Sequence, residues 1–130
     1  MRFLRFVIPE RDSRTGMPYG LLTIAYDRLH SGELSSDVEA QLREHVGWLE
    51  RNLPIPDRFA RKRNVSHKNT LGLSWLKAEA TLAVGHMHAV AGILRTYGYP
   101  VEMLVTARPG YVVYEDDQQI VAEPFHGEPA

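Results

Sequence analysis

The stretch from Ser74 to Gly98, SWLKAEATLAVGHMHAVAGILRTYG, constrains the fold more than any other part of the chain. It is rich in alanine and leucine and contains no proline, as a helix requires. Ser74 is a candidate N-cap, and Gly98 followed by Pro100 supplies an end. We therefore predict one long helix with other elements packed around it.

The two faces of this predicted helix differ in kind. Apolar residues spaced alternately four and three positions apart form a seam that we expect to face the core. The seam consists of Leu76, Ala80, Ala83, Met87, Val90, Leu94 and Tyr97. The opposite face carries the small residues Ala78, Gly85, Ala89 and Gly92. Small side chains let another backbone approach closely, so we expect a neighbouring element or a second copy of the chain to cover this face.

His86 and His88 stand two positions apart within this run. Successive residues of an α-helix turn by about 100°, so the two rings point to opposite flanks and do not hold one ion together. We interpret both as structural histidines at the boundary of the core, and we predict no metal site and no cofactor. The alternatives are a pH-sensitive packing role and a metal site completed by a distant residue such as His45 or Asp116.

The remaining segments predict both strands and helices. Residues 2–8 alternate with two apolar faces, which indicates a strand between neighbours. Helices are expected at 21–30 and from Ser36 to Pro54, the second with a capping box formed by Ser36 and Glu39. The last third predicts a meander of three strands, VEMLVTA, YVVYE and QIVAEPF, joined by RPG and EDDQ turns.

The expected order β-α-α-α-β-β-β makes this an α+β protein with helices on one face of a mainly antiparallel sheet. A length of 130 residues with 44% hydrophobic and 24% charged residues fits one domain over 1–130, with a basic loop at 54–71 and a frayed tail at 126–130. The absence of cysteine excludes disulfides, thiolate nucleophiles and zinc held by sulfur. We find no signal peptide or membrane span in the pattern and predict a cytoplasmic protein.

The segment 54–71, PIPDRFARKRNVSHKNTL, concentrates positive charge in a chain whose formal net charge is -1. We predict that it binds an acidic protein or a phosphate-bearing ligand. The binding residues are expected to be Arg58, Arg61, Arg63, Lys68, Trp75 and Lys77. A solvated loop is the plainer interpretation. Nucleic-acid binding is disfavoured, because only Phe59 is available in the segment to stack on bases.

A small enzyme is the alternative to a binding protein. Its site would lie between the basic loop, the long helix and the C-terminal hairpin, with Lys77, His88, Tyr114, Glu115 and Asp116 as candidate catalytic residues. Acidic residues at a hairpin turn also have a purely conformational explanation. The LGLSW segment lacks the second glycine of a nucleophile elbow, and the chain has no glycine-rich phosphate loop. We therefore favour a homodimeric binding protein over an enzyme.

Three segments resemble a family of small bacterial proteins: LPIPDRF, SWLK and GYPVEMLVTARPGYVVYEDDQQIVAEPF. The most specific part is PGYVVYEDDQQIVAEPF, and the resemblance extends over the C-terminal two thirds of the chain. It implies a self-contained bacterial domain. It carries over no activity, cofactor or site residue.

Overall fold

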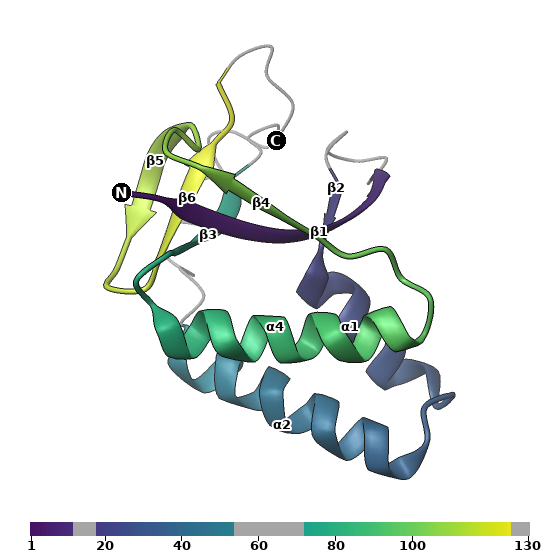
Figure 1. The fold of residues 1–130 in the computed structure, drawn as a ribbon. Coiled ribbons are helices and arrows are strands. Elements are labelled where there is room, and N and C mark those ends of the chain that lie inside the picture. The colour runs from purple at the N-terminus through teal and green to yellow at the C-terminus, as the bar shows by residue number, and fades with distance from the viewer. Residues whose placement is uncertain (12–17, 54–71, 126–130) are drawn as a thin grey trace, which may run out of the picture.

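The fold is given by a computed structural model that describes residues 1–11, 18–53 and 72–125 (Figure 1). In chain order its elements are β1 (Phe3–Arg11), β2 (Pro18–Gly20), α1 (Leu21–Ser31), α2 (Ser36–Asn52), β3 (Leu73–Lys77), α4 (Thr81–Thr96), β4 (Glu102–Thr106), β5 (Tyr111–Glu115) and β6 (Gln119–Glu123). Within these ranges a curled antiparallel sheet of six strands packs against three helices, which confirms the predicted α+β class. The observed order contains two strands, β2 and β3, that the sequence pattern does not predict.

The sheet is built around β1, which has a strand on each side. One edge of β1 pairs with β4, and the other pairs first with β3 and then with β2. From β3 the sheet continues through β6 to β5. Leu4 and Phe6 on one face of β1 and Val7 on the other are all buried, as expected of the strand between neighbours that the pattern predicts.

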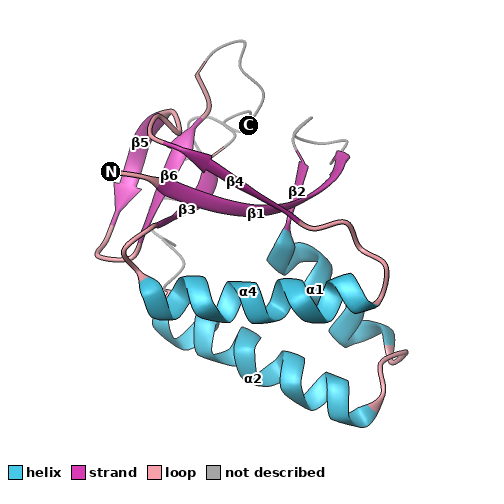
Figure 2. Ribbon diagram, in the orientation of Figure 1, coloured by secondary structure: helices cyan, strands magenta, loops and turns pink. Residues whose placement is uncertain are grey.

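Two apolar cores lie on the two faces of the sheet. Phe6, Ile8 and Leu76 face the helices and form the larger core with α1, α2 and α4. Inside the curl, Leu73, Trp75, Ile120 and Ala122 form a second core, against which Phe3 and Leu104 pack. Figure 2 shows the helices together on one side of the sheet, so the second core lies on the side away from them.

The prediction of one helix from Ser74 to Gly98 is wrong. Residues Leu73–Lys77 form β3, which pairs with β1 and β6, and α4 begins only at Thr81. Ser74 is therefore an exposed residue within a strand instead of a helix cap. The run LSWLK buries Leu73 and Trp75 on one face of the sheet and Leu76 on the other, an arrangement that pairing with distant strands stabilises.

The two earlier helices form where the sequence predicts them. α1 ends at Gly32, whose φ of 71° is the left-handed conformation that glycine accepts readily. The N-cap of α2 is Ser35 and not Ser36, because the Ser35 hydroxyl accepts a hydrogen bond from the Val38 backbone nitrogen at 3.4 Å. The apolar stripe of α2 is buried as expected: Leu42, Val46 and Leu49.

All three C-terminal strands form, but they do not make a complete meander. β5 and β6 pair as a hairpin, whereas β4 pairs with β1. Consequently β4 and β5, although adjacent in sequence, stand at opposite ends of the strand order. Among the described helices, none has the length and apolar character needed to cross a membrane.

Candidate functional site

Arg5 is the charged residue that the fold places most unusually. Its cross-strand partner is Leu104, which packs on the inner core, so Arg5 also projects toward the inside of the curl. Its Nη1 donates a hydrogen bond to the Ser74 carbonyl oxygen at 3.3 Å, and its Nη2 donates to the Pro18 carbonyl oxygen at 3.4 Å. The guanidinium thus bridges β3 and β2 at the point where β1 passes from one partner to the other.

Among the described residues, the Arg5 charge is poorly compensated. Both hydrogen bonds are close to the upper distance limit, and the buried Nε has no hydrogen-bond partner in the described part of the chain. Among the described residues, no carboxylate forms an ion pair with Arg5. Burial lowers the pKa of the guanidinium from its ordinary value to about 10, because loss of water disfavours the charged form. An anion bound beside this guanidinium would supply the missing negative charge and stabilise its charged form.

The surroundings of Arg5 connect it to the basic segment. Pro18 follows residues 12–17 directly, and Ser74 lies two residues after Gly72, where the chain re-enters the described structure after 54–71. The guanidinium is therefore bonded to two points at which these segments join the sheet. Of the predicted binding residues, four lie outside the described residues: Arg58, Arg61, Arg63 and Lys68.

The other two predicted binding residues are described. Trp75 is only 5% exposed and lies in the inner core opposite Ile120, so its ring is not available to an external partner. Lys77 ends β3, and its Nζ forms an ion pair with Glu115 at 2.6 Å. The sequence predicts both residues in a helix and on a binding surface, whereas β3 turns them toward the inner face.

Four of the five candidate catalytic residues lie near the tip of the β5–β6 hairpin, where they form two pairs. Besides the Lys77–Glu115 pair, the Tyr114 hydroxyl donates to the Asp116 carboxylate at 2.9 Å. The same carboxylate accepts hydrogen bonds from the backbone nitrogens of Gln118 and Gln119 and from the Gln119 side chain. Asp116 thereby holds the turn closed, which is the conformational role that acidic residues play at such positions.

The ionisation of this cluster favours a structural role. Burial raises the pKa of Asp116, but the hydrogen bonds from Gln118, Gln119 and Tyr114 outweigh it and leave the pKa below its usual value. The Tyr114 hydroxyl has a raised pKa because it donates a hydrogen bond to Asp116, and the ion pair with Glu115 raises the pKa of Lys77. These shifts move each proton equilibrium further from neutrality, whereas a general acid or base works best with a pKa near it.

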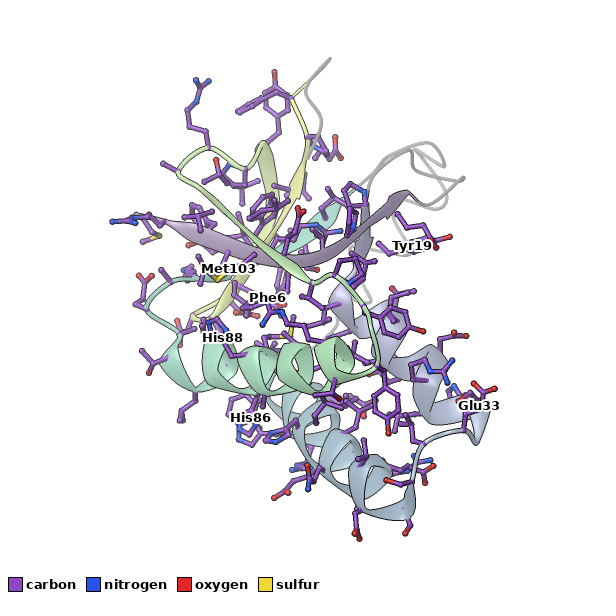
Figure 3. All side chains as sticks on the ribbon, turned by 45° about the vertical axis from the view of Figure 1, so that its right-hand side comes forward. Phe6, Tyr19, Glu33, His86, His88 and Met103 are labelled. Carbon is purple, nitrogen blue, oxygen red and sulfur yellow. The ribbon has the colours of Figure 1, made fainter. Side chains whose placement is uncertain are left out.

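The two conspicuous histidines lie on opposite flanks of α4, as helix geometry predicts (Figure 3). The rings of His88 and Phe6 of the sheet lie nearly perpendicular, with their centroids 4.9 Å apart. His86 instead faces α2, where it stacks on Trp48 at 4.3 Å and its Nδ1 lies 2.9 Å from that of His45. His88 therefore stands apart from the hairpin cluster. In the described ranges, no group of three or more His, Cys, Asp or Glu is assembled to hold a metal ion.

The small-residue face is largely open to solvent. Gly85 and Gly92 are exposed, and beyond the backbone of α4 itself a Cβ added at either would meet no described atom within 4 Å. Ala89 is half-buried, while Ala78 belongs to the turn before α4 and not to the helix. No described part of the chain covers this face at its glycines. Coverage by a second copy of the chain, the other predicted possibility, remains an expectation.

The described residues thus define an α+β protein whose curled sheet holds an arginine with no carboxylate partner among them, with three helices on its outer face. No protein-family model, curated protein or solved structure matches the chain. The resemblance to small bacterial proteins accordingly stays an expectation from the sequence.

Proposed function

We propose that this protein is a cytoplasmic binding protein that recognises an anionic group of its partner, a carboxylate or a phosphate, at Arg5. The observation that carries this proposal is the half-buried Arg5 guanidinium, which has two long hydrogen bonds to carbonyl oxygens and no carboxylate partner among the described residues. Arginine suits this role because its planar donors match carboxylate and phosphate geometry. The reducing cytoplasm agrees with a chain free of cysteine.

The basic segment 54–71 supplies the second part of the proposal. It rejoins the described chain at Gly72, two residues before the Ser74 carbonyl that Arg5 contacts. Positive charge there attracts an acidic or phosphorylated partner over a distance, and Arg5 then pairs with one group at short range. We assign the long-range attraction to four of its residues: Arg58, Arg61, Arg63 and Lys68.

The short-range part is tested with inorganic phosphate and with citrate as probes, added at constant ionic strength against sodium chloride. NMR of the arginine Nε–H groups should show a shift of the Arg5 signal, and the unfolding temperature should rise with probe concentration. The Arg5→Gln variant should lose both responses. The matched control is Arg2→Gln, which removes an exposed arginine near the start of the same strand and should respond like the wild type.

Arg5 also bridges two strands, so its loss alone could lower stability without any role in binding. The Arg5→Lys variant separates the two explanations, because lysine keeps the charge but not the planar set of donors. Under the proposal, a folded Arg5→Lys protein binds phosphate more weakly than the wild type. A wild type whose Arg5 signal and stability ignore both anions contradicts the proposal.

The long-range part is tested with fluorescein-labelled oligoglutamate and a phosphoserine peptide, by fluorescence anisotropy at several salt concentrations. Replacing Arg58, Arg61, Arg63 and Lys68 by alanine should weaken binding and flatten its salt dependence. A labelled single-stranded DNA serves as a comparison. Tighter binding of DNA than of either peptide at every salt concentration would favour a nucleic-acid partner instead.

A further inference from the structure

The described sheet has three strands with a free edge: β2, β4 and β5 each pair with one neighbour only. A free edge presents unpaired N–H and C=O groups and invites pairing with another chain. Proteins usually prevent this with short strands, proline, bulges or charged side chains. The three edges of this sheet differ in how far they are protected.

Two of the edges carry such protection. β2 is three residues long, begins with Pro18 and leads directly into α1. β5 has a register shift between Val112 and Tyr114, and a bulge of this kind twists an edge away from a flat partner. Its last residue, Glu115, also carries a charge.

β4 has only one of these features, the charged Glu102 at its first residue. Its five residues, Glu102–Thr106, pair with β1 in continuous register and contain no lysine, proline or bulge. Met103 and Val105 are 40% and 46% exposed, although they lie opposite the buried Phe6 and Leu4 on the helix side of the sheet. Figure 3 shows Met103 beside Phe6, near His88 of α4. A regular apolar edge of this kind is stable in solution when another strand covers it.

We propose that β4 pairs antiparallel with β4 of a second copy of the chain, about a two-fold axis at Leu104. This register is the one that pairs all five residues of both strands. It places Met103 of each copy opposite Val105 of the other, so the exposed apolar side chains cover one another. The inference does not depend on Arg5, which projects from the inner face of β1.

The charges at the ends of β4 agree with a second copy as the occupant. The strand begins with the exposed Glu102, and the exposed Arg108 follows two residues after its last residue, Thr106. An antiparallel two-fold brings the beginning of one strand against the end of the other. Glu102 then lies opposite Thr106 and diagonal to Arg108 of the other copy, a pairing of opposite charges. A parallel pairing would instead bring the two Glu102 carboxylates together.

The first test is the molar mass in solution, measured by light scattering during gel filtration across a dilution series. The wild type should be a dimer at high concentration and dissociate on dilution. Val105→Lys should be monomeric throughout, because a lysine on the edge opposes pairing. Val112→Lys is the matched control, since Val112 of β5 is similarly exposed at 49%, and this variant should dimerise like the wild type.

The second test uses the absence of cysteine from the chain, which leaves only introduced thiols to react. The double variant Met103→Cys/Val105→Cys should form disulfide-linked dimers on mild oxidation, since the two positions face each other across the axis. Each single variant should link far less. Circular dichroism checks that all variants keep the fold.

Three results would overturn the proposal: a wild type that stays monomeric at every concentration, a dimer that Val105→Lys leaves intact, or a double-cysteine variant that remains unlinked. A Gly85→Glu variant identifies the competing surface. If it abolishes the dimer while Val105→Lys does not, the exposed glycine face of α4 is the interface. A chain ending at residue 125 that dimerises more tightly than the full chain would instead indicate that the C-terminal segment occupies the β4 edge.

Discussion

Gly110 occupies a position that no other residue fills without strain. Its φ is 139°, and a Cβ built on it would lie 2.1 Å from the backbone carbonyl oxygen of Glu123. We expect Gly110→Ala to destabilise the protein by roughly 1–3 kcal/mol, measured by urea denaturation, because the β5–β6 hairpin must open to admit the methyl group. The RPG pattern predicts a glycine turn here, but not the contact with Glu123.

The control for this prediction is Gly98→Ala. Gly98 also has a positive φ, 92°, but nothing lies within 4 Å of its Cβ position. Its replacement therefore costs only the backbone conformation. Equal losses in the two variants would show that the Glu123 contact contributes nothing.

His86 should make stability depend on pH. Burial, followed by the nearby His45, lowers the pKa of His86, and Glu44 opposes the shift only in part. Below the ordinary pKa of 6.5 the unfolded chain takes up a proton more readily than the folded one, so stability falls as the pH drops through this value. We expect the urea midpoint to be lower at about pH 5.5 than at about pH 7.5.

The His86→Gln variant should show a smaller loss between these two pH values than the wild type. His88→Gln is the control on the other flank of α4, where the ring meets Phe6. If the His86→Gln variant loses as much stability between these pH values as the wild type, neither His86 nor its contact with His45 causes the pH dependence. Helix geometry predicts that the two histidines separate, but their partners follow from how α4 crosses α2 and β1.

The hydrogen-bond partners of Arg5 are not predictable from the sequence of its own strand. The pattern of residues 2–8 predicts the strand and both of its apolar faces. Whether a charge in such a strand finds an acidic partner depends on the neighbouring strands. Here β2 and β3 offer it only carbonyl oxygens, and neither strand is predicted from the sequence. The prediction of Trp75 as a binding residue is wrong for the same reason, because the sequence does not predict β3.

At the scale of elements, α4 carries two glycines that its own packing does not need. Both are exposed within the helix, with no atom near their Cβ positions. Gly85→Ala and Gly92→Ala should each raise the free energy of unfolding by about 0.5–1 kcal/mol, because alanine favours helix more strongly than glycine. Urea denaturation at a concentration where the protein is monomeric measures this gain.

Gly47 of α2 supplies the comparison. A Cβ there would lie 3.1 Å from the Arg51 guanidinium, so Gly47→Ala should gain less than the two α4 variants. A loss of stability at Gly85 or Gly92 would contradict the prediction. It would indicate that a second backbone approaches this face closely.

The elements that the sequence predicts correctly are those with local patterns and local ends. α1 ends at a glycine, α2 begins at a serine cap, and β5 and β6 flank a turn that Asp116 closes. β3 is different, because LSWLK runs into an alanine-rich segment with no glycine or proline between them. Its strand conformation comes from pairing with β1 and β6, which lie far away in sequence. No local pattern contains that information.

At the scale of the whole molecule, β1 joins the two cores. Phe6 and Ile8 belong to the helix-side core, whereas Phe3 packs on the inner core from the opposite face of the same strand. Gln118 adds a second link, since its side-chain nitrogen donates to the Asn52 carbonyl oxygen at the end of α2. The α+β class follows from the order of elements, but the curl and its inner core follow from β4 pairing with β1 instead of β5.

This arrangement predicts that the two layers unfold together. The chain has two tryptophans, Trp48 in the helix layer and Trp75 in the inner core, so Trp75→Phe and Trp48→Phe each leave a reporter in one layer. Within each variant, the urea midpoint from tryptophan fluorescence should equal that from circular dichroism, because unfolding either core breaks up β1 and exposes the other. Ile120→Ala in the inner core should lower the midpoint reported by Trp48 as well. If fluorescence and circular dichroism give separate transitions, or if Trp48 does not respond to Ile120→Ala, the two layers are independent and β1 does not couple them.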